Sequence, residues 1–202
     1  MIKRLFSRNP QKFSSRRFNK VIKNAIKFLE RSPLHSLNFQ KFSGSGVYAL
    51  YYLGNFYSEL VEEPSQICIN PIYIGKAVPT GWRTARVKHD NESTNLYKRL
   101  REHITNIDYV NNLNLEDFSC RYVTVDPDLI APLEAEMIRR YQPLWNSVID
   151  GFGNHNVGKT RFDQAKSEWD ILHPGRPWVE NMRGKSPTFE QVVEKIQTTL
   201  RK

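Results

Sequence analysis

The sequence predicts an α+β fold, in which helices flank a small antiparallel or mixed sheet. Segments 47–53, 71–78 and 118–125 are rich in apolar, aromatic and β-branched residues, a composition typical of strands. Apolar residues recur at helical spacing over 95–107 and again over about 131–142, so each segment is expected to form a helix with one buried side. The resulting order of strand, strand, helix, strand and helix leads to this arrangement.

A basic amphipathic helix is expected before the sheet, over residues 16–31, and Pro33 follows its end. A Gly/Ser segment at 43–46 separates this helix from the first strand. Residues 53–66 open with a turn-forming Gly-Asn pair and end beside a proline, which indicates a loop or a short hairpin. The apolar residues that recur within the helix are Phe18, Ile22, Ile26 and Leu29.

Proline and glycine punctuate the second half of the chain. Residues 79–93 are polar and predict a loop. Pro132 suits the first turn of the helix over about 131–142, and Pro143 ends that helix. The segments expected beyond Asn146 are a glycine-rich loop at 150–161, a helix at 161–172, a proline-rich coil and a terminal helix at 187–200.

The net charge of +9 is concentrated at the N-terminus. The first 29 residues carry nine basic residues and no acidic one, while the other 173 residues hold 21 of each sign. A basic arm of this kind suits an anionic polymer such as nucleic acid, because each neutralised phosphate releases counterions. Its composition also resembles an organelle transit peptide, and a simple solvated tail is the third interpretation.

The rest of the composition excludes several classes of protein. Two cysteines, Cys68 and Cys120, exclude a disulfide framework and a four-cysteine zinc site, and they fit a reducing cytosol. No run of about 18 apolar residues occurs, so a transmembrane helix is not expected. A chain of 202 residues can bury roughly 70% of its unfolded surface, so it needs neither metal nor disulfide to fold.

Four residues with reactive or charged side chains occupy defined places on the expected elements. Tyr48 and Tyr73 lie near the ends of two adjacent strands and meet on one face if those strands pair, although aromatic residues are common in strands for structural reasons alone. Arg99 and His103 are four residues apart on the first helix of the core, so both project from one side. A guanidinium can hold a phosphate with two parallel hydrogen bonds, and an imidazole can accept a proton near neutral pH. The alternative is a solvated arginine beside a buried, hydrogen-bonded histidine.

Glu134 and Asn146 are the candidates in the second helix of the core and just beyond it. Glu134 lies beside an apolar stripe, where a carboxylate is costly unless something pairs with it. Mg²⁺ is a suitable partner, because it typically binds one or two protein carboxylates together with waters and substrate phosphate. Asn146 follows twelve residues later, where its side chain can tie the end of the helix to a strand.

Taken together, these residues resemble the GIY-YIG nuclease family. The sequences GVY and YIG, an arginine with a histidine four residues later, and a glutamate with an asparagine twelve residues later occur in the family's order over residues 44–148. Val47, which replaces the isoleucine of the first motif, is a conservative departure. The resemblance implies a three-stranded antiparallel sheet flanked by helices, and hydrolysis of phosphodiester bonds that depends on one divalent metal ion, expected to be Mg²⁺ with Mn²⁺ as a substitute.

The resemblance also implies a role for each matched residue. The base that deprotonates the attacking water is either Tyr48, which then passes the proton towards His103 or solvent, or Lys76 directly after YIG, with Tyr48 only positioning the water. The implied roles are Tyr48 and Tyr73 as active-site tyrosines, Arg99 as phosphate clamp, His103 as proton acceptor or relay, Glu134 as metal ligand and Asn146 as structural support.

Two features resemble the type II restriction endonuclease branch of this family that cuts the palindrome CCGCGG. One is an insertion at 77–94, and the other is a C-terminal part that contains GFGNHN, Gly158–Lys159 and WDILHPGRPW at 169–178. Basic and amide side chains in both regions are candidates for DNA contact, either by reading guanine edges or by holding phosphates alone. The candidates are Arg83, Arg86 and Lys88 in the insertion, and Asn154, His155, Lys159 and Arg161 in the C-terminal part.

The expected organisation is a basic helical arm at 1–43, a nuclease core at 44–148, and an extension at 149–202 that adds DNA contacts or a dimer contact. Cutting both strands of a palindrome needs two active sites, so a homodimer on double-stranded DNA is expected, in the bacterial cytoplasm and with no membrane partner. Two alternatives stay open. One is a homing or repair nuclease of the same chemistry that acts as a monomer, and the other is a DNA-binding module without catalysis.

Overall fold

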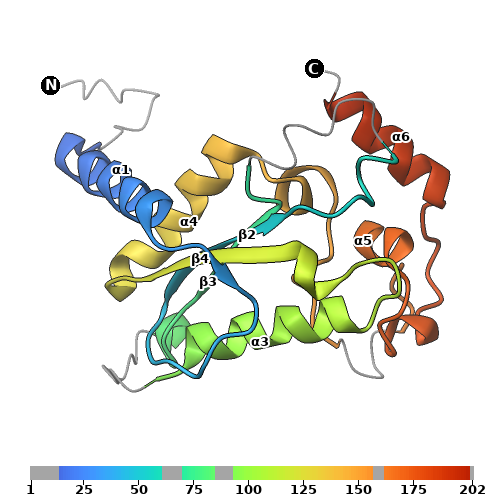
Figure 1. Cartoon of the computed structure of the whole chain (residues 1–202), viewed down its shortest axis with the longest axis horizontal. Helices are drawn as coiled ribbons and strands as arrows, with labels where there is room; N and C mark the ends of the chain where they lie inside the picture. Colours follow the sequence, from blue (N-terminus) through green and yellow to red (C-terminus); the bar gives the residue numbers. More distant parts are fainter. Residues whose placement is uncertain (1–13, 61–69, 85–92, 157–161, 201–202) are drawn as a thin grey trace, which may run out of the picture.

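The computed structural model of the chain describes residues 14–60, 70–84, 93–156 and 162–200. Within these residues an antiparallel sheet of four strands, in the order β1-β4-β2-β3, lies at the centre of the molecule (Figure 1). The strands are β1 (His35–Ser36), β2 (Gly46–Tyr52), β3 (Tyr73–Ala77) and β4 (Phe118–Thr124).

Helices α1 (Arg16–Arg31) and α4 (Pro127–Tyr141) cover one face of the sheet (Figure 1). Ser15 caps the start of α1, where its side chain accepts a hydrogen bond from the backbone N–H of Phe18 (3.3 Å). The apolar side of α1 packs against α4 and the sheet, so its basic side chains face solvent. The core of this face consists of Ile22, Ile26, Leu29, Val47, Ala49, Ile74, Val123, Ile130, Leu133 and Met137.

The second face of the sheet is covered by α3 (Asn95–Asp108) and by the C-terminal part of the chain. That part contributes a π-helical turn, η3 (Leu144–Val148), and two helices, α5 (Glu168–Leu172) and α6 (Phe189–Leu200). Side chains from all four elements share one core with the tyrosines of β2, including Tyr48, Leu100, Ile104, Trp145, Trp169 and Ile196. Short 3₁₀ segments occur at η1 (Trp82–Thr84), η2 (Leu115–Asp117) and η5 (Val179–Asn181).

The α+β fold and the order of the strands and helices of the core are confirmed. The helix expected at 16–31 is α1, the terminal helix is α6, and the three expected strands are β2, β3 and β4. The expectation of three strands is wrong by one, since His35 and Ser36 pair with Cys120 and Ser119 at the free edge of β4. A strand of two residues is too short to produce a readable alternation of apolar and polar side chains.

Helix α4 begins earlier than expected, at Pro127 instead of about residue 131. Pro127 takes the favourable place in the first turn, and Pro132, which was expected there, lies inside the helix. Because proline has no N–H, the carbonyl of Asp128 lacks its helical partner, but Asp128 is exposed and water can hydrate that carbonyl.

The helix expected at 161–172 is also shorter, because the described part of that segment is helical only over α5. The carbonyls of Phe162 and Gln164 accept hydrogen bonds from the N–H groups of Arg183 (2.7 Å) and Gly184 (3.1 Å). These backbone groups are therefore committed to a neighbouring segment instead of a helix, and the side chain of Ser167 caps the start of α5.

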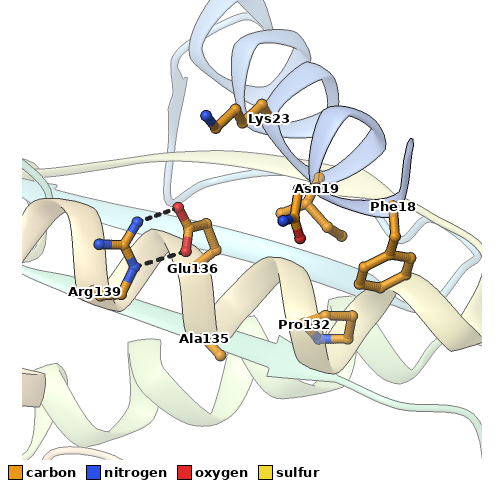
Figure 2. A pocket seen from close by; sticks show the side chains of 8 residues that line it. Phe18, Asn19, Lys23, Pro132, Ala135, Glu136 and Arg139 are labelled. Atoms are coloured by element: carbon orange, nitrogen blue, oxygen red, sulfur yellow. Dashed lines mark hydrogen bonds and ion pairs between the residues drawn. The ribbon is translucent and has the colours of Figure 1, made fainter. Parts of the chain in front are cut away.

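A groove of about 510 Å³ lies between α1 and α4 (Figure 2). It is lined by Phe18, Asn19 and Lys23 from α1 and by Pro132 and the exposed part of α4, where Glu136 and Arg139 form an ion pair. None of the residues proposed from the sequence for catalysis or metal binding lines this groove.

Candidate active site

The pairing of β2 with β3 brings the two motif tyrosines together. Tyr48 lies opposite Gly75 and Tyr73 lies opposite Leu50, so both side chains project from the face that carries α3. Their ring centroids are 6.2 Å apart. A side chain at position 75 would collide with the hydroxyl end of Tyr48, so only glycine leaves room for that ring.

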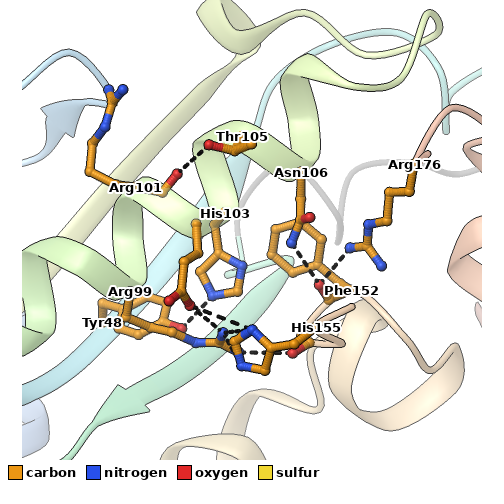
Figure 3. A network of polar contacts seen from close by, with 11 residues as sticks. Tyr48, Arg99, Arg101, His103, Thr105, Asn106, Phe152, His155 and Arg176 are labelled. Carbon is orange, nitrogen blue, oxygen red and sulfur yellow. Dashed lines mark hydrogen bonds and ion pairs between the residues drawn. The ribbon is translucent and has the colours of Figure 1, made fainter. Parts of the chain in front are cut away.

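Tyr48 is hydrogen-bonded to His103 of α3, with 2.5 Å between its Oη and Nε2 of the imidazole (Figure 3). Both side chains are fully buried. The imidazole is stacked on the ring of Phe152, with centroids 4.5 Å apart and planes inclined by 15°. Nδ1 of His103 is a buried polar atom that has no hydrogen-bond partner among the described residues.

Arg99 lies one helical turn before His103 and points to the same side of α3 (Figure 3). Its guanidinium donates hydrogen bonds to Oε2 of Glu102 (2.7 Å), to Nε2 of His155 (2.8 Å) and to the carbonyl of Gly153 (2.9 Å). The side chain of Arg99 is 18% exposed, so its guanidinium remains accessible from one side.

Glu134 of α4 forms an ion pair with Lys76 of β3. The side chain of Glu134 is 15% exposed and that of Lys76 is 39% exposed. The negative charge of Glu134 is among the lesser causes of the raised pKa of both Tyr48 and Tyr73, after burial. Of the five groups expected to converge, Tyr48, Tyr73, Arg99 and His103 lie together on the face that carries α3, and Glu134 is paired with Lys76 of β3.

The electrostatic environment keeps the Tyr48–His103 pair neutral. Burial, followed by the neighbouring Tyr73, raises the pKa of Tyr48 well above that of a free phenol, although Arg99 opposes this effect. Burial, followed by the positive charge of Arg99, lowers the pKa of His103 well below its ordinary value. At neutral pH the pair therefore consists of a phenol and a neutral imidazole that can accept a proton.

Asn146 lies in η3 and supports the free edge of β3. Its Oδ1 accepts a hydrogen bond from the N–H of Ile74 and its Nδ2 donates one to the carbonyl of the same residue, both at 2.8 Å. One amide side chain thus satisfies both backbone groups of Ile74, as a neighbouring strand would. This contact fixes β3 between Tyr73 and Gly75.

The donor set at Glu134 fits a hard cation that brings most of its own ligands. In the part of the chain that the structure describes, no cluster of three or more His, Cys, Asp or Glu side chains could enclose a metal ion. A single accessible carboxylate is instead the kind of site used by Mg²⁺, which keeps several waters and also binds substrate phosphate.

A family model described as the Eco29kI GIY-YIG domain matches residues 40–200 of the chain. The chain belongs to this family. It is therefore a restriction-type nuclease that acts on DNA, of a family that generally uses divalent metal ions. A comparison with curated proteins gave no match. None of the helices among the described residues has the length and apolar character needed to cross a membrane.

In this GIY-YIG nuclease, the candidates for DNA contact are only partly described. Asn154 and His155 are exposed on the loop beside Arg99, and His155 touches both Arg99 and, at 3.8 Å, the carboxylate of Glu102. For Arg83 the structure describes only the backbone, which lies in η1. Candidates that lie outside the described residues are Arg86, Lys88, Lys159 and Arg161.

Three residues at the site were not identified from the sequence. Glu102 is three residues from Arg99 on the same helix, so the usual spacing of helical ion pairs indicates it. Phe152 reaches His103 from a loop, and no local pattern predicts such a contact. Arg176 lies inside the segment 169–178, but its neighbours in sequence give no sign that its side chain is buried.

Proposed function

We propose that this protein is a type II restriction endonuclease that hydrolyses both strands of a palindromic, GC-rich site in double-stranded DNA, similar to CCGCGG. The observation that carries the proposal is that Tyr48, Tyr73, Arg99 and His103 lie together on one face of the sheet, in a chain whose Glu134 carboxylate is paired with Lys76 of the neighbouring strand β3. Hydrolysis of a phosphodiester needs a deprotonated water and positive charge around the phosphoryl group, and these groups supply both.

Tyr48 is the group that orients and deprotonates the attacking water. Its high pKa makes spontaneous ionisation at neutral pH rare, so it needs a base that removes its own proton. His103 lies in hydrogen-bond contact and is neutral, so Tyr48 passes its hydroxyl proton to Nε2 as it accepts one from the water. Lys76 is a weaker candidate for the base, because its amino group is engaged in the ion pair with Glu134.

Arg99 is the phosphate clamp. In the DNA-free protein its guanidinium contacts Glu102, which is 48% exposed and can turn into solvent when a phosphate takes its place. The water attacks phosphorus and the bond to the 3′ oxygen breaks, so the products carry a 5′-phosphate and a 3′-hydroxyl. The 3′ oxygen takes up a proton from solvent.

Glu134 would hold the divalent cation, which we propose to be Mg²⁺, with Mn²⁺ as a substitute. When bound, such a cation supplies positive charge that stabilises the leaving oxygen and orients the phosphate. With Glu134 holding a cation, Lys76 would be released from its ion pair and could add its own charge near the same phosphate. Tyr73, whose ring packs beside Tyr48, shapes the pocket for the water.

Two copies of the chain act together on DNA in this proposal. Each chain carries one such site, and a two-fold axis places a second site on the opposite strand of a palindrome. Residues 77–94 and 149–202 provide DNA contacts, with Asn154 and His155 closest to the scissile phosphate because His155 touches Arg99. A restriction enzyme of this kind meets its DNA in the bacterial cytoplasm.

The proposal is tested by incubating the purified protein with plasmid DNA and Mg²⁺ and sequencing the ends of the fragments. We expect discrete fragments whose ends carry a 5′-phosphate and lie within one palindrome. A single rare cut, or nicking confined to damaged DNA, contradicts the restriction assignment and favours a homing or repair nuclease. Absence of cleavage with both Mg²⁺ and Mn²⁺ contradicts catalysis altogether and favours a DNA-binding module.

A further inference from the structure

Arg176 is a fully buried cation that the proposed mechanism does not use. The residue is 1% exposed, and its guanidinium carbon lies over the indole rings of Trp169, at 4.1 Å from the ring centroid, and Trp178, at 5.5 Å. The guanidinium donates hydrogen bonds to the carbonyls of Gly151 (2.9 Å) and Phe152 (2.7 Å). A longer contact, 3.3 Å, joins it to the carboxylate of Asp170.

The loop that Arg176 holds leads directly to the candidate active site (Figure 3). The ring of Phe152 is stacked on His103 and also meets Tyr73 edge-on, with centroids 4.9 Å apart. The next residue, Gly153, accepts the hydrogen bond from Arg99 through its carbonyl. Two consecutive residues of one loop therefore set the positions of the imidazole and of the guanidinium clamp.

Burying the charged guanidinium of Arg176 costs desolvation free energy. Burial is the main cause that lowers its pKa to about 10, and its Nε has no hydrogen-bond partner among the described residues. An apolar side chain of similar volume fills such a cavity without the cost of desolvating a charge. What the guanidinium adds is a rigid fork whose two ends fix two successive carbonyls.

We infer that Arg176 is a positioning residue for DNA cleavage, which acts through the backbone of Gly151 and Phe152 to hold His103 and Arg99 in their working places. This inference rests on the proposed function. The charge of Arg176 also acts on His103, as do Arg99 from the same helix and His155. From the sheet, the neutral phenols of Tyr48 and Tyr73 face the imidazole.

The test compares Arg176→Met and Arg176→Lys with the wild type and with Asp170→Asn. The asparagine variant weakens the same buried ion pair but leaves the hydrogen bonds to the two carbonyls, so it is the matched control for stability. Four quantities are measured for each protein: the single-turnover rate of plasmid cleavage with Mg²⁺, the pH–rate profile, the Kd for a plasmid fragment in EDTA, and the melting temperature. Cleavage and binding are measured well below the lowest melting temperature.

We expect Arg176→Met to slow cleavage by about 10- to 100-fold, because small displacements of catalytic groups have effects of this size, with an unchanged Kd. Loss of the positive charge raises the pKa of His103, so the acid limb of the profile moves to higher pH. Arg176→Lys keeps the charge but not the fork, so it slows cleavage and leaves the limb in place. Asp170→Asn cleaves at close to the wild-type rate.

The inference is overturned if Arg176→Met cleaves at the wild-type rate, or if Asp170→Asn loses as much rate as Arg176→Met with no change in either pH profile. Should the methionine variant fail to fold, a wild-type rate for Arg176→Lys overturns it equally. These results require that the wild type cleaves DNA. Absence of wild-type cleavage instead overturns the proposed function, and this inference with it.

Discussion

Two tyrosine–histidine pairs lie on the same side of the sheet, and only one of them has the surroundings of an active site. Tyr48 meets His103 at 2.5 Å, and Tyr57 meets Nε2 of His173 at 2.8 Å. All four side chains are buried, and burial is the main cause that lowers the pKa of both histidines and raises that of both tyrosines.

The pairs differ in what surrounds them. The Tyr57 hydroxyl also accepts a hydrogen bond from Nε1 of Trp145 (2.6 Å), and Nδ1 of His173 is paired with Oδ1 of Asn112 (3.0 Å). The Tyr48 pair instead lies beside Arg99, and the charges of Arg99 and Glu134 both act on the pKa of Tyr48. The same two side chains therefore serve packing when every polar atom is satisfied, and become candidates for chemistry when charges that can bind a phosphate stand next to them.

The sharpest test of this comparison is removal of each hydroxyl. Tyr48→Phe is expected to slow DNA cleavage by about 10²- to 10⁴-fold, the usual contribution of a positioned acid–base group. Tyr57→Phe is expected to cleave at nearly the wild-type rate. Single-turnover cleavage of plasmid DNA measures both, and equal losses in the two variants contradict the distinction.

Arg99→Ala removes the charged neighbour that sets the first pair apart. We expect turnover to fall by about 10²- to 10³-fold, as for loss of a donor that stabilises the developing charge, with an unchanged circular dichroism spectrum. Arg101→Ala on the exposed side of the same helix controls for loss of one positive charge. Turnover near the wild-type level in Arg99→Ala removes Arg99 from the phosphate clamp.

Stability should show the opposite order. Tyr57→Phe leaves Trp145 Nε1 and His173 Nε2 without their shared partner, which costs about 1–3 kcal/mol in the free energy of unfolding. Urea unfolding at neutral pH measures this loss, with Tyr109→Phe, an exposed tyrosine, as the control. A loss no larger than that of the control indicates that the Tyr57 network adds nothing to the fold.

A further prediction concerns the pH dependence of stability. Burial, together with the charge of Arg176, lowers the pKa of His173 from 6.5 to about 3. In the unfolded chain His173 is protonated below about pH 6.5, whereas in the folded protein it stays neutral down to about pH 3. The free energy of unfolding therefore falls as the pH drops through that window, by at most about 1.4 kcal/mol per pH unit. His173→Gln should flatten the stability curve between these values.

The pH–rate profile provides the contrast. His103 is also kept neutral, but only its protonation stops the proposed proton transfer. The His173→Gln variant should therefore keep the acid limb of the wild-type profile, measured by initial cleavage rates from pH 8 down to the lowest pH at which both proteins stay folded. A shifted limb in that variant places His173 in the catalytic proton path and removes the distinction between the pairs.

Much of the fold follows from local patterns in the sequence. The strands and α3 carry apolar residues in the patterns typical of strands and helices over five or more residues, and the predicted bounds of these elements lie close to the observed ones. β1 was missed because His35 and Ser36 form a strand only through their pairing with β4. The helix expected at 161–172 starts later than predicted because the carbonyls of Phe162 and Gln164 accept hydrogen bonds from a distant segment, which no local pattern reveals.

The candidate site shows the same division. Tyr48, Tyr73, Arg99, His103 and Glu134 were identified because their motifs and spacings place them on defined elements. The structure places the first four together and pairs Glu134 with Lys76. Phe152 and Arg176 come from loops whose course depends on the packing of the whole C-terminal part. Their contacts arise only from the tertiary structure, so spacing alone could not indicate them.

The central claim is that Glu134, together with the two phenols and the guanidinium of Arg99, makes this chain a metal-dependent nuclease. A paired measurement on Glu134→Ala tests it most directly. We predict that cleavage of plasmid DNA with Mg²⁺ disappears, while the Kd for DNA and its salt dependence stay close to those of the wild type. Glu136→Ala, two residues along α4 and paired with Arg139, should cleave normally. Undiminished cleavage by Glu134→Ala contradicts the account.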